Sequence, residues 1–203
     1  MNNEMIIEVN EVYKKYDDAT VLDNVSLEIE KGKIYGLVGR NGSGKTVLMK
    51  CICGLIKPTS GEVKVAGKTV GKDVDIPEDI GVIIETPGFI PNYSGFKNLK
   101  LLASVRNKIS NEEIRKSMEI VGLEPKSRKH VGKYSLGMRQ KLGIAQAIME
   151  KPKILILDEP MNGLDNESVA VVRKILKEQA ENGATIILAS HNREDIDVLC
   201  DKV

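Results

Sequence analysis

Apolar positions along this 203-residue chain fall into short uninterrupted runs and into longer stretches with helical spacing. Short apolar runs bounded by glycine or proline are typical of strands, whereas apolar residues three and four positions apart indicate a helix with one buried face. On this basis the predicted strands span residues 5–9, 26–30, 33–38, 62–65, 80–85, 154–157 and 185–189. The predicted helices span residues 47–55, 96–105, 111–121, 137–149 and 167–181.

The order of these elements predicts an α/β fold. The predicted strand at 154–157 is a continuous apolar run, which favours a strand buried on both faces of a parallel sheet, and 185–189 is read as another buried strand. The middle of the chain is helical instead, and Ser110-x-x-Glu113 matches a capping box at the start of its second helix. The sequence therefore predicts a single domain over residues 1–203, with a parallel-sheet core and a helical insertion at about 90–135.

The strongest candidate for chemistry lies between the strand at 33–38 and the helix that follows it. The segment reads Gly39-Arg40-Asn41-Gly42-Ser43-Gly44-Lys45-Thr46, a complete G-x-x-x-x-G-K-[ST] loop. Glycines let the backbone turn so that successive N–H groups face a phosphate, and the following helix directs its unpaired N–H groups at the same anion. Lys45 can then reach the outer phosphates, and the Thr46 hydroxyl can bind Mg²⁺. These eight residues are therefore the predicted nucleotide-binding loop.

A second candidate site follows the strand at 154–157, where Asp158 and Glu159 are adjacent in sequence. In phosphate-loop enzymes an acid at such a strand end helps to hold the Mg²⁺ that the loop hydroxyl binds. A neighbouring carboxylate within hydrogen-bond reach can take a proton from an attacking water. We therefore predict that Asp158 binds metal and that Glu159 is the general base. The plainer interpretation is a strand that ends in solvated acids.

Charge is balanced over the whole chain but uneven along it. The formal net charge is +1, which gives no global attraction to nucleic acid. Between residues 96 and 133, however, ten Lys or Arg residues stand against four Glu residues. Two interpretations remain open for this excess: solvated helix faces, or a surface that faces anionic lipid headgroups.

Cysteine usage and the N-terminal sequence bear on the compartment. The chain has three cysteines, and Cys51 and Cys53 lack the spacing of a redox or zinc motif, which favours reduced cytosolic thiols. The N-terminal segment has no basic-then-apolar signal pattern, and no apolar run approaches the length of about eighteen residues that a membrane span requires. We expect a cytoplasmic chain whose membrane role depends on a partner.

Three further segments and one tyrosine complete a known pattern. Residues 134–140 (YSLGMRQ) occupy the place of an LSGGQ signature, and residues 162–165 (NGLD) resemble the loop that follows the acidic strand. Residues 189–191 (ASH) resemble a segment that carries a switch histidine, and Tyr16 stands where an aromatic residue stacks on adenine. Over nearly its whole length the chain resembles an ATP-binding cassette (ABC) subunit, the nucleotide-hydrolysing domain of ABC transporters.

The resemblance implies a fold and a shared site. The expected fold is a P-loop NTPase core with a mostly parallel sheet, an N-terminal antiparallel β portion and a helical insertion subdomain. Ser135 and Gly137 would begin a helix that caps the γ-phosphate held by a second chain, so that two ATP molecules lie between two identical or similar chains. His191 would donate to the γ-phosphate and the attacking water, and Tyr16 would stack on adenine. Without the resemblance, His191 could simply cap a helix and Tyr16 could simply pack.

Two departures from the general pattern narrow the family. Glu85 stands where most of these ATPases carry a glutamine, and Leu136 and Met138 replace a glycine and a glutamine of the signature. Both features are similar to the bacitracin- and lantibiotic-resistance exporters of Gram-positive bacteria. Glu85 would then bring a carboxylate near Mg²⁺ and the lytic water, as a metal ligand and catalytic residue. Asp165 is expected to be structural at the interface between chains.

The resemblance implies an ATPase subunit with ATP and Mg²⁺ bound, which powers a separate transmembrane permease from the cytoplasmic face of the membrane. The expected cargo is a peptide antibiotic or another amphiphile, and no nucleic-acid partner is expected. The alternatives are a cassette that acts on nucleic acid or ribosomes and a nucleotide-dependent regulator with little turnover. The sequence ends at Val203, where members of the family usually continue, so a naturally minimal protein and a truncated one both remain open.

Overall fold

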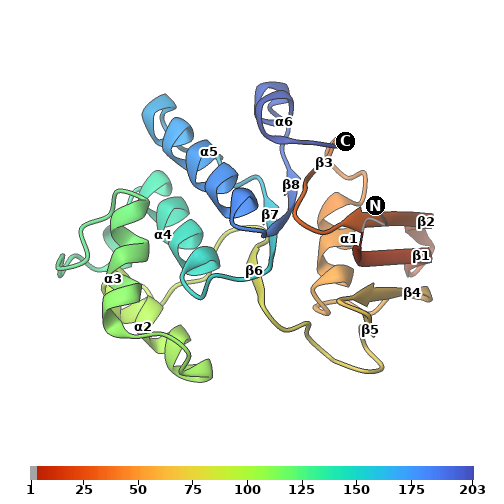
Figure 1. Ribbon diagram of the computed structural model, residues 1–203, viewed down its shortest axis with the longest axis horizontal. Coiled ribbons are helices and arrows are strands. Elements are labelled where there is room, and N and C mark those ends of the chain that lie inside the picture. Colours follow the sequence, from red (N-terminus) through yellow and green to blue (C-terminus); the bar gives the residue numbers. More distant parts are fainter. Residues whose placement is uncertain (1–3) are drawn as a thin grey trace.

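Two sheets with a helix between them form the body of the molecule in the computed structural model, which describes residues 4–203 (Figure 1). The strands are β1 (Met5–Tyr16), β2 (Ala19–Glu30), β3 (Ile34–Leu37), β4 (Ser60–Val65), β5 (Lys68–Thr69), β6 (Ile80–Ile83), β7 (Ile154–Asp158) and β8 (Thr185–Ala189). The helices are α1 (Lys45–Ile52), α2 (Gly95–Arg106), α3 (Asn111–Ile120), α4 (Leu136–Ile148), α5 (Asn166–Glu181) and α6 (Arg193–Leu199), with a 3-10 turn η1 (Val131–Lys133). Every predicted element is present, whereas β5 and α6 were not predicted.

The parallel sheet has the strand order β3-β8-β7-β6. The predicted site residues lie at the ends of β3, β7 and β8. Its central strands β7 and β8 pair with Ile156 opposite Ile187. Successive side chains of β7 alternate between the faces: Leu155 and Leu157 pack in the cluster with α4 and α5, whereas Ile156 packs in the cluster with α1. Because helices cover both faces, these strands are apolar except at Asp158, which ends β7, and Thr185, which begins β8.

The second sheet is antiparallel, has the order β2-β1-β4-β5, and lies on the other side of α1 (Figure 1). The pairing of β1 with β2 contains register shifts, and Glu11 and Asn24 have left-handed φ angles of 46° and 50°. Bulges of this kind break the alternation of apolar and polar positions. The sequence therefore predicted only 5–9 and 26–30, and the structure corrects these bounds to two strands of twelve residues each.

Helices α2, α3 and α4 pack together beside the parallel sheet, at the left of Figure 1. α3 begins with the predicted capping box: Ser110 Oγ accepts from the Glu113 backbone N–H at 3.3 Å, and Glu113 Oε2 accepts from the Ser110 backbone N–H at 2.8 Å. These bonds hold the pKa of Glu113 below its usual range. α4 also packs against β6 and so joins the helices to the sheet. The limits of the insertion, about 90–135, stay a prediction.

Two further features of the described residues bear on environment. No helix in residues 4–203 is long and apolar enough to span a bilayer. Cys51, Cys53 and Cys200 are free thiols. Cys53 is buried, and burial raises its pKa to about 12, so this thiol stays protonated at neutral pH.

Candidate functional site

The predicted phosphate loop joins the carboxyl end of β3 to α1. α1 begins at Lys45, two residues before the predicted start at 47, and ends at Ile52. Gly44 caps this helix with a φ angle of 89°, and a Cβ atom there would lie 2.8 Å from the carbonyl oxygen of Val21. The left-handed φ and the close approach both require glycine. The local structure is therefore the strand–loop–helix that the motif needs.

A cavity of about 350 Å³, which we name the phosphate-loop cavity, opens at this loop. Its lining consists of Val21, residues 41–47, Asp158 and Glu159. The unpaired backbone N–H groups at the start of α1 favour an anion on one side. The two carboxylates at the end of β7 favour a cation on the other side. The cavity therefore suits an anionic group that carries a bound cation.

Lys45 lies across its own loop. Its Nζ donates to the carbonyl oxygen of Gly39 at 2.6 Å and to that of Arg40 at 3.1 Å. These bonds hold the ammonium group beside the cavity, where a phosphate can replace carbonyl oxygens as its acceptor. Gly39 and Arg40 themselves line a neighbouring cavity of about 800 Å³, together with His191.

Thr46 and Asp158 meet across 112 positions of sequence, and Thr46 Oγ1 donates to Asp158 Oδ2 at 2.6 Å. Hydroxyl and carboxylate oxygens are ligands that Mg²⁺ accepts, usually with phosphate and water oxygens in its other positions. The described residues hold no group of three or more His, Cys, Asp or Glu side chains placed around a metal. This pair therefore fits Mg²⁺ that arrives with a phosphate ligand.

Glu159 and His191 also meet at the edge of the parallel sheet. Glu159 follows β7 and His191 follows β8, and the Glu159 backbone N–H donates to the Ala189 carbonyl oxygen at 2.9 Å. Glu159 Oε2 lies 2.7 Å from His191 Nδ1. The Glu159 side chain is 28% exposed, so a water can reach it. The two residues that the sequence named as base and switch histidine are thus hydrogen-bond partners.

Glu85 lies beside α1 rather than in the phosphate-loop cavity. Its Oε1 forms an ion pair with Lys50 Nζ at 2.6 Å, and Lys50 is one helical turn beyond Thr46. Glu85 is not among the residues that line the cavity. The proposed roles of Glu85 in metal binding and catalysis stay predictions.

Tyr16 ends β1 and is also outside the lining of the phosphate-loop cavity. Its ring is exposed, and Lys14 Nζ lies 4.8 Å from the ring centroid. An exposed ring backed by a cation is available for stacking. Adenine binding by Tyr16 stays a prediction.

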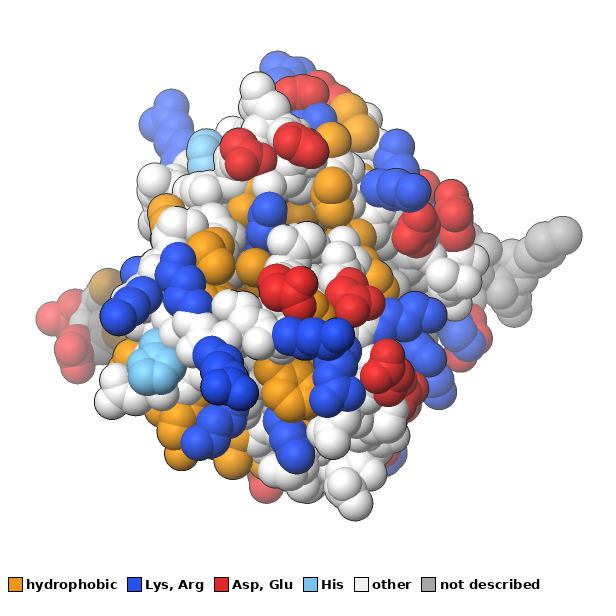
Figure 2. Space-filling model, turned by 90° about the vertical axis from the view of Figure 1, so that its left-hand side faces the viewer, with side chains coloured by type: hydrophobic (Ala, Val, Ile, Leu, Met, Phe, Trp, Pro, Cys, Tyr) orange, Lys and Arg blue, Asp and Glu red, His pale blue; other side chains and the backbone are white. Residues whose placement is uncertain are grey.

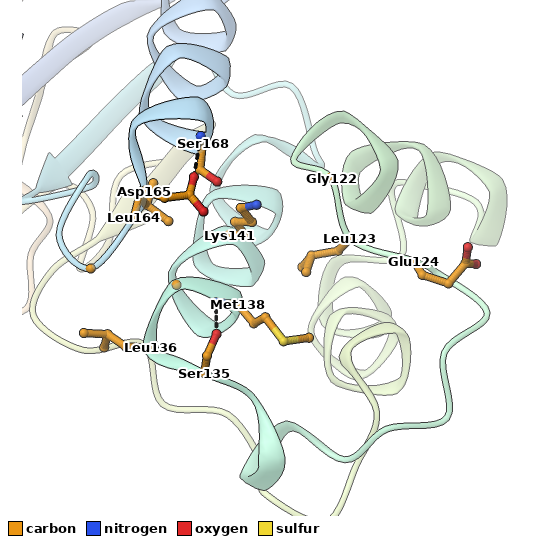
Figure 3. A pocket seen from close by; sticks show the side chains of 12 residues that line it. Gly122, Leu123, Glu124, Ser135, Leu136, Met138, Lys141, Leu164, Asp165 and Ser168 are labelled. Atoms are coloured by element: carbon orange, nitrogen blue, oxygen red, sulfur yellow. Dashed lines mark hydrogen bonds between the residues drawn. The ribbon is translucent and has the colours of Figure 1, made fainter.

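Ser135 and Gly137 line a different cavity of about 570 Å³, which we name the signature cavity (Figure 3). Ser135 caps α4, since its Oγ accepts from the Met138 backbone N–H at 3.2 Å. α4 begins at Leu136, one residue before the predicted start at 137. The signature cavity and the phosphate-loop cavity share no lining residue. The structure therefore does not bring Ser135 and Gly137 to the phosphate loop of their own chain.

Leu136 and Gly163 hold the signature segment against the loop at 162–165. Gly163 has a φ angle of 74°, and a Cβ atom there would lie 2.5 Å from Leu136 Cδ2. A Cβ atom on Gly137 would lie 2.9 Å from the Gly163 carbonyl oxygen. The leucine that departs from the usual glycine thus packs on a glycine of the facing loop.

Asp165, at the end of that loop, caps α5 and lines the signature cavity (Figure 3). Its Oδ1 accepts from the Ser168 backbone N–H at 2.8 Å. Hydrogen bonds from Ser168, with the nearby charge of Lys141, lower the pKa of Asp165. In Figure 3 the Lys141 side chain lies between Asp165 and Leu123. Asp165 is thus a helix cap, and its place at an interface between chains stays a prediction.

Gln140, the last residue of the signature segment 134–140, has no role predicted from the sequence. Its side chain is buried, and Nε2 donates to the carbonyl oxygens of Glu159 at 3.2 Å and Pro160 at 2.9 Å. It thus connects the signature helix α4 to the strand end that carries Glu159. Its position on the buried face of a predicted helix was a signal that could have suggested a partner.

A second missed group supports the segment that carries His191. Asp195 in α6 is buried and accepts from Arg173 Nη2 of α5 at 2.6 Å and from Ser190 Oγ at 3.1 Å. Arg173 Nη1 also donates to Glu194 at 2.8 Å. Ser190 directly precedes His191, so this network braces the end of β8. No local pattern signals it, because it depends on how α5 packs against α6.

Known proteins with the same arrangement identify the family. Residues 22–162 match the family model described as ABC transporter. The uncharacterized ABC transporter ATP-binding protein YybJ of Bacillus subtilis is 49% identical over 97% of this chain and 90% of its own length. The bacitracin transport ATP-binding protein BcrA of Enterococcus faecalis is 44% identical over 98% of this chain, which spans only 66% of that protein.

A solved structure agrees with these relatives. A protein described as the ATP binding subunit of an ABC transporter matches 98% of this chain and 85% of its own length, with a TM-score of 0.87 and 28% identity. The family model covers well over half of the chain, and the fold agrees over nearly all of it. The chain therefore belongs to the ABC transporter family and is an ATP-binding cassette of that family, which confirms the family and the fold class that the sequence predicts.

Proposed function

We propose that this cassette binds ATP with Mg²⁺, hydrolyses it to ADP and phosphate, and so powers a separate transmembrane subunit. The observation that carries the proposal is the meeting of Lys45, Thr46, Asp158 and Glu159 around one cavity, with His191 bonded to Glu159. A phosphate binder, a pair of cation ligands and a base are the parts that phosphoryl transfer to water needs.

Each residue has a distinct task in this proposal. The loop N–H groups and Lys45 bind the phosphates, while Thr46 and Asp158 would hold Mg²⁺. When bound, Mg²⁺ neutralises phosphate charge and aligns the terminal phosphate. Glu159 takes the proton of the attacking water, and His191, 2.7 Å away, orients that carboxylate. All of these residues belong to one chain and would supply one half of the site.

The second half of the site would come from another chain. Ser135 and Gly137 stand at the start of α4, whose free N–H groups can bind the terminal phosphate held by a partner cassette. This proposal is supported by the separation of the signature cavity from the phosphate-loop cavity. ATP would then favour the closed pair, because its γ-phosphate contacts both chains, and hydrolysis would remove that preference.

The proposed cargo is a peptide antibiotic or similar amphiphile that leaves the cell or its membrane. The support is the 44% identity with a bacitracin transport ATP-binding protein, together with Glu85, Leu136 and Met138 in the positions noted above. The proposed location is the cytoplasmic face of the membrane, through the permease partner.

A co-purification experiment tests the transport proposal. The tagged full-length protein is expressed in its native host and recovered from detergent-solubilised membranes, and the proteins that accompany it are identified by mass spectrometry. A multi-spanning membrane protein in stoichiometric amount is the expected result. Recovery only from the soluble fraction, alone or with ribosomes, would overturn the transport role and leave the ATPase chemistry standing.

A further inference from the structure

Acidic residues are missing from two long segments of the helical region. Between residues 86 and 149 every Asp or Glu lies within 112–124. The segment 86–111 carries four Lys or Arg residues and the segment 125–149 carries six, with no acid in either. A solvated helix face normally mixes both signs of charge. The separation of basic from acidic residues along these segments therefore favours an anionic partner.

The fold brings these two segments side by side. The Val131 backbone N–H donates to the Tyr93 carbonyl oxygen at 2.8 Å, and the Gly132 N–H donates to the Pro91 carbonyl oxygen at 2.9 Å. The basic loop before the signature thus lies against the chain that enters α2. We name the exposed cations that result the basic face; its members are Lys97, Lys100, Lys126, Arg128, Lys129 and Lys133. Figure 2 shows Lys and Arg side chains gathered on the lower half of this side of the molecule.

None of the six cations forms an ion pair with another described residue. Other cations of the same region do: Arg106 pairs with Glu150 and Arg115 pairs with Glu112. Two members of the basic face lie over aromatic rings instead. Lys97 Nζ is 3.7 Å from the ring centroid of Tyr93, and Lys129 Nζ is 6.0 Å from that of Tyr134. The charge of this face is therefore left for an external anion.

Apolar side chains extend the basic face along α2. Lys97, Leu101 and Val105 are four residues apart and so share one side of the helix. Leu101 is exposed, and Val105 is 81% exposed. Figure 2 shows hydrophobic side chains among the cations on this side. Cations next to exposed apolar side chains suit the headgroup region of a bilayer, where both kinds of group find partners.

We propose that the basic face binds the surface of an anionic lipid bilayer. The proposal rests on the proposed function in one respect: a permease partner brings the cassette to a membrane. Juxtamembrane Lys and Arg residues each add to the attraction of an anionic leaflet, by about fivefold in affinity per residue. The basic face would then fix the orientation of the cassette beneath its permease.

Vesicle binding tests the proposal. The purified chain is sedimented with vesicles of equal parts phosphatidylglycerol and phosphatidylcholine, and with vesicles of phosphatidylcholine alone. The variant replaces Lys126, Arg128, Lys129 and Lys133 by Gln. The matched control replaces Lys33, Lys68, Lys72 and Lys177, which are exposed elsewhere, by Gln and so has the same net charge.

The expected result is binding to the anionic vesicles only, which weakens at about 1 M salt where charges are screened beyond about 3 Å. The basic-face variant should lose about 100-fold or more in affinity, whereas the control should bind like the parent protein. No binding to anionic vesicles, equal binding to both vesicles, or equal loss in both variants would overturn the proposal. So would binding of single-stranded RNA, but not vesicles, with the same dependence on the basic face.

ATP binding, measured by fluorescence with a labelled nucleotide in the same preparations, separates this inference from the proposed function. None of the substituted residues lines the phosphate-loop cavity, so all variants should bind ATP equally. If the parent protein bound ATP but did not bind the anionic vesicles, the lipid proposal alone would be overturned. Vesicle binding without ATP binding would overturn the proposed function alone.

Discussion

The phosphate-loop cavity and the signature cavity are both open hollows next to a helix N-terminus, yet they differ in chemistry. The phosphate-loop cavity gathers a lysine, a hydroxyl and two carboxylates from two separate parts of the chain, residues 45–46 and 158–159. The signature cavity is also lined by a lysine, Lys141, and by two carboxylates, Glu124 and Asp165, but Asp165 is already engaged as the cap of α5. In the phosphate-loop cavity, by contrast, Thr46 donates to Asp158, a pair that suits a cation, and the neighbouring Glu159 can accept a proton.

This difference supports the proposal that a second copy or a related chain completes the site. Leu136 at the signature is 55% exposed, although it is a large apolar residue beside the cavity. An exposed apolar residue at such a position is expected to be covered when another chain docks. The two cavities can therefore be separated by mutation: one should control the chemical step and the other should control pairing.

The largest effect is expected for Glu159→Gln. The amide cannot take a proton from water, so turnover should fall by about 10²- to 10⁴-fold. ATP binding should survive, because the phosphate loop is unchanged, and an ATP-dependent dimer should accumulate. Steady-state ATPase assays and size-exclusion chromatography with ATP measure both results. Glu167→Gln, in the exposed first turn of α5, is the control; turnover of Glu159→Gln at the parent rate would remove Glu159 as the base.

The next effect concerns the network behind His191. Arg173→Met leaves the buried Asp195 carboxylate without its cation, which should lower the free energy of unfolding by about 3 kcal/mol. Urea denaturation followed by circular dichroism measures the loss. Lys174→Met removes only an exposed pair with Glu178 and should change stability by less than about 1 kcal/mol. Equal stability of the two variants would show that the network does not brace this strand end.

Lys45→Ala should weaken ATP binding by about tenfold to 100-fold, the value of a charge-assisted contact with phosphate. The ammonium group is bonded only to loop carbonyls, so its removal should leave folding nearly unchanged. Equilibrium binding of a fluorescent ATP analogue provides the measurement. An unchanged dissociation constant would contradict the assignment of the phosphate loop.

The smallest effect, about tenfold in turnover, is expected for Gly163→Ala. Its Cβ atom would collide with Leu136 and displace the signature segment, whereas ATP binding by the single chain should stay the same. Gly67→Ala is a close control, because Gly67 has a φ angle of 75° but nothing within 4 Å of the added Cβ.

Leu136→Ala should restore part of the lost turnover in the Gly163→Ala background, because it removes the atoms in collision. ATPase rates of the two single variants and the double variant measure this coupling. Additive losses would mean that the contact between Leu136 and Gly163 does not link the two segments.

Local motifs predicted most of the phosphate-loop cavity but not the support around it. The loop at 39–46 follows β3, Asp158 ends β7 and Glu159 comes next, so the chemistry and the place of these residues could be inferred together. The ion pair of Lys50 with Glu85 joins residues 35 positions apart and has no sequence signal. The same holds for Arg173 with Asp195, which depends on the packing of two helices.

The predicted strand bounds were wrong where the backbone is irregular. The bulges near Glu11 and Asn24 interrupt the two-residue period. The sequence pattern therefore predicted only the regular part of each strand, residues 5–9 of β1 and residues 26–30 of β2. The strands β7 and β8 were predicted almost to the residue, because burial on both faces makes nearly every position apolar.

The sequence by itself determined most of the elements, the glycine-dependent loop and the candidate reacting side chains, because these depend on residues close together in the chain. Only the tertiary structure decided that β7 lies beside β8 and that α1 lies behind both, and these placements bring Glu159 within 2.7 Å of His191 and Thr46 within 2.6 Å of Asp158. It also decided that the signature lies away from the loop of its own chain. Distances between remote residues follow from strand order and packing, which no local pattern encodes.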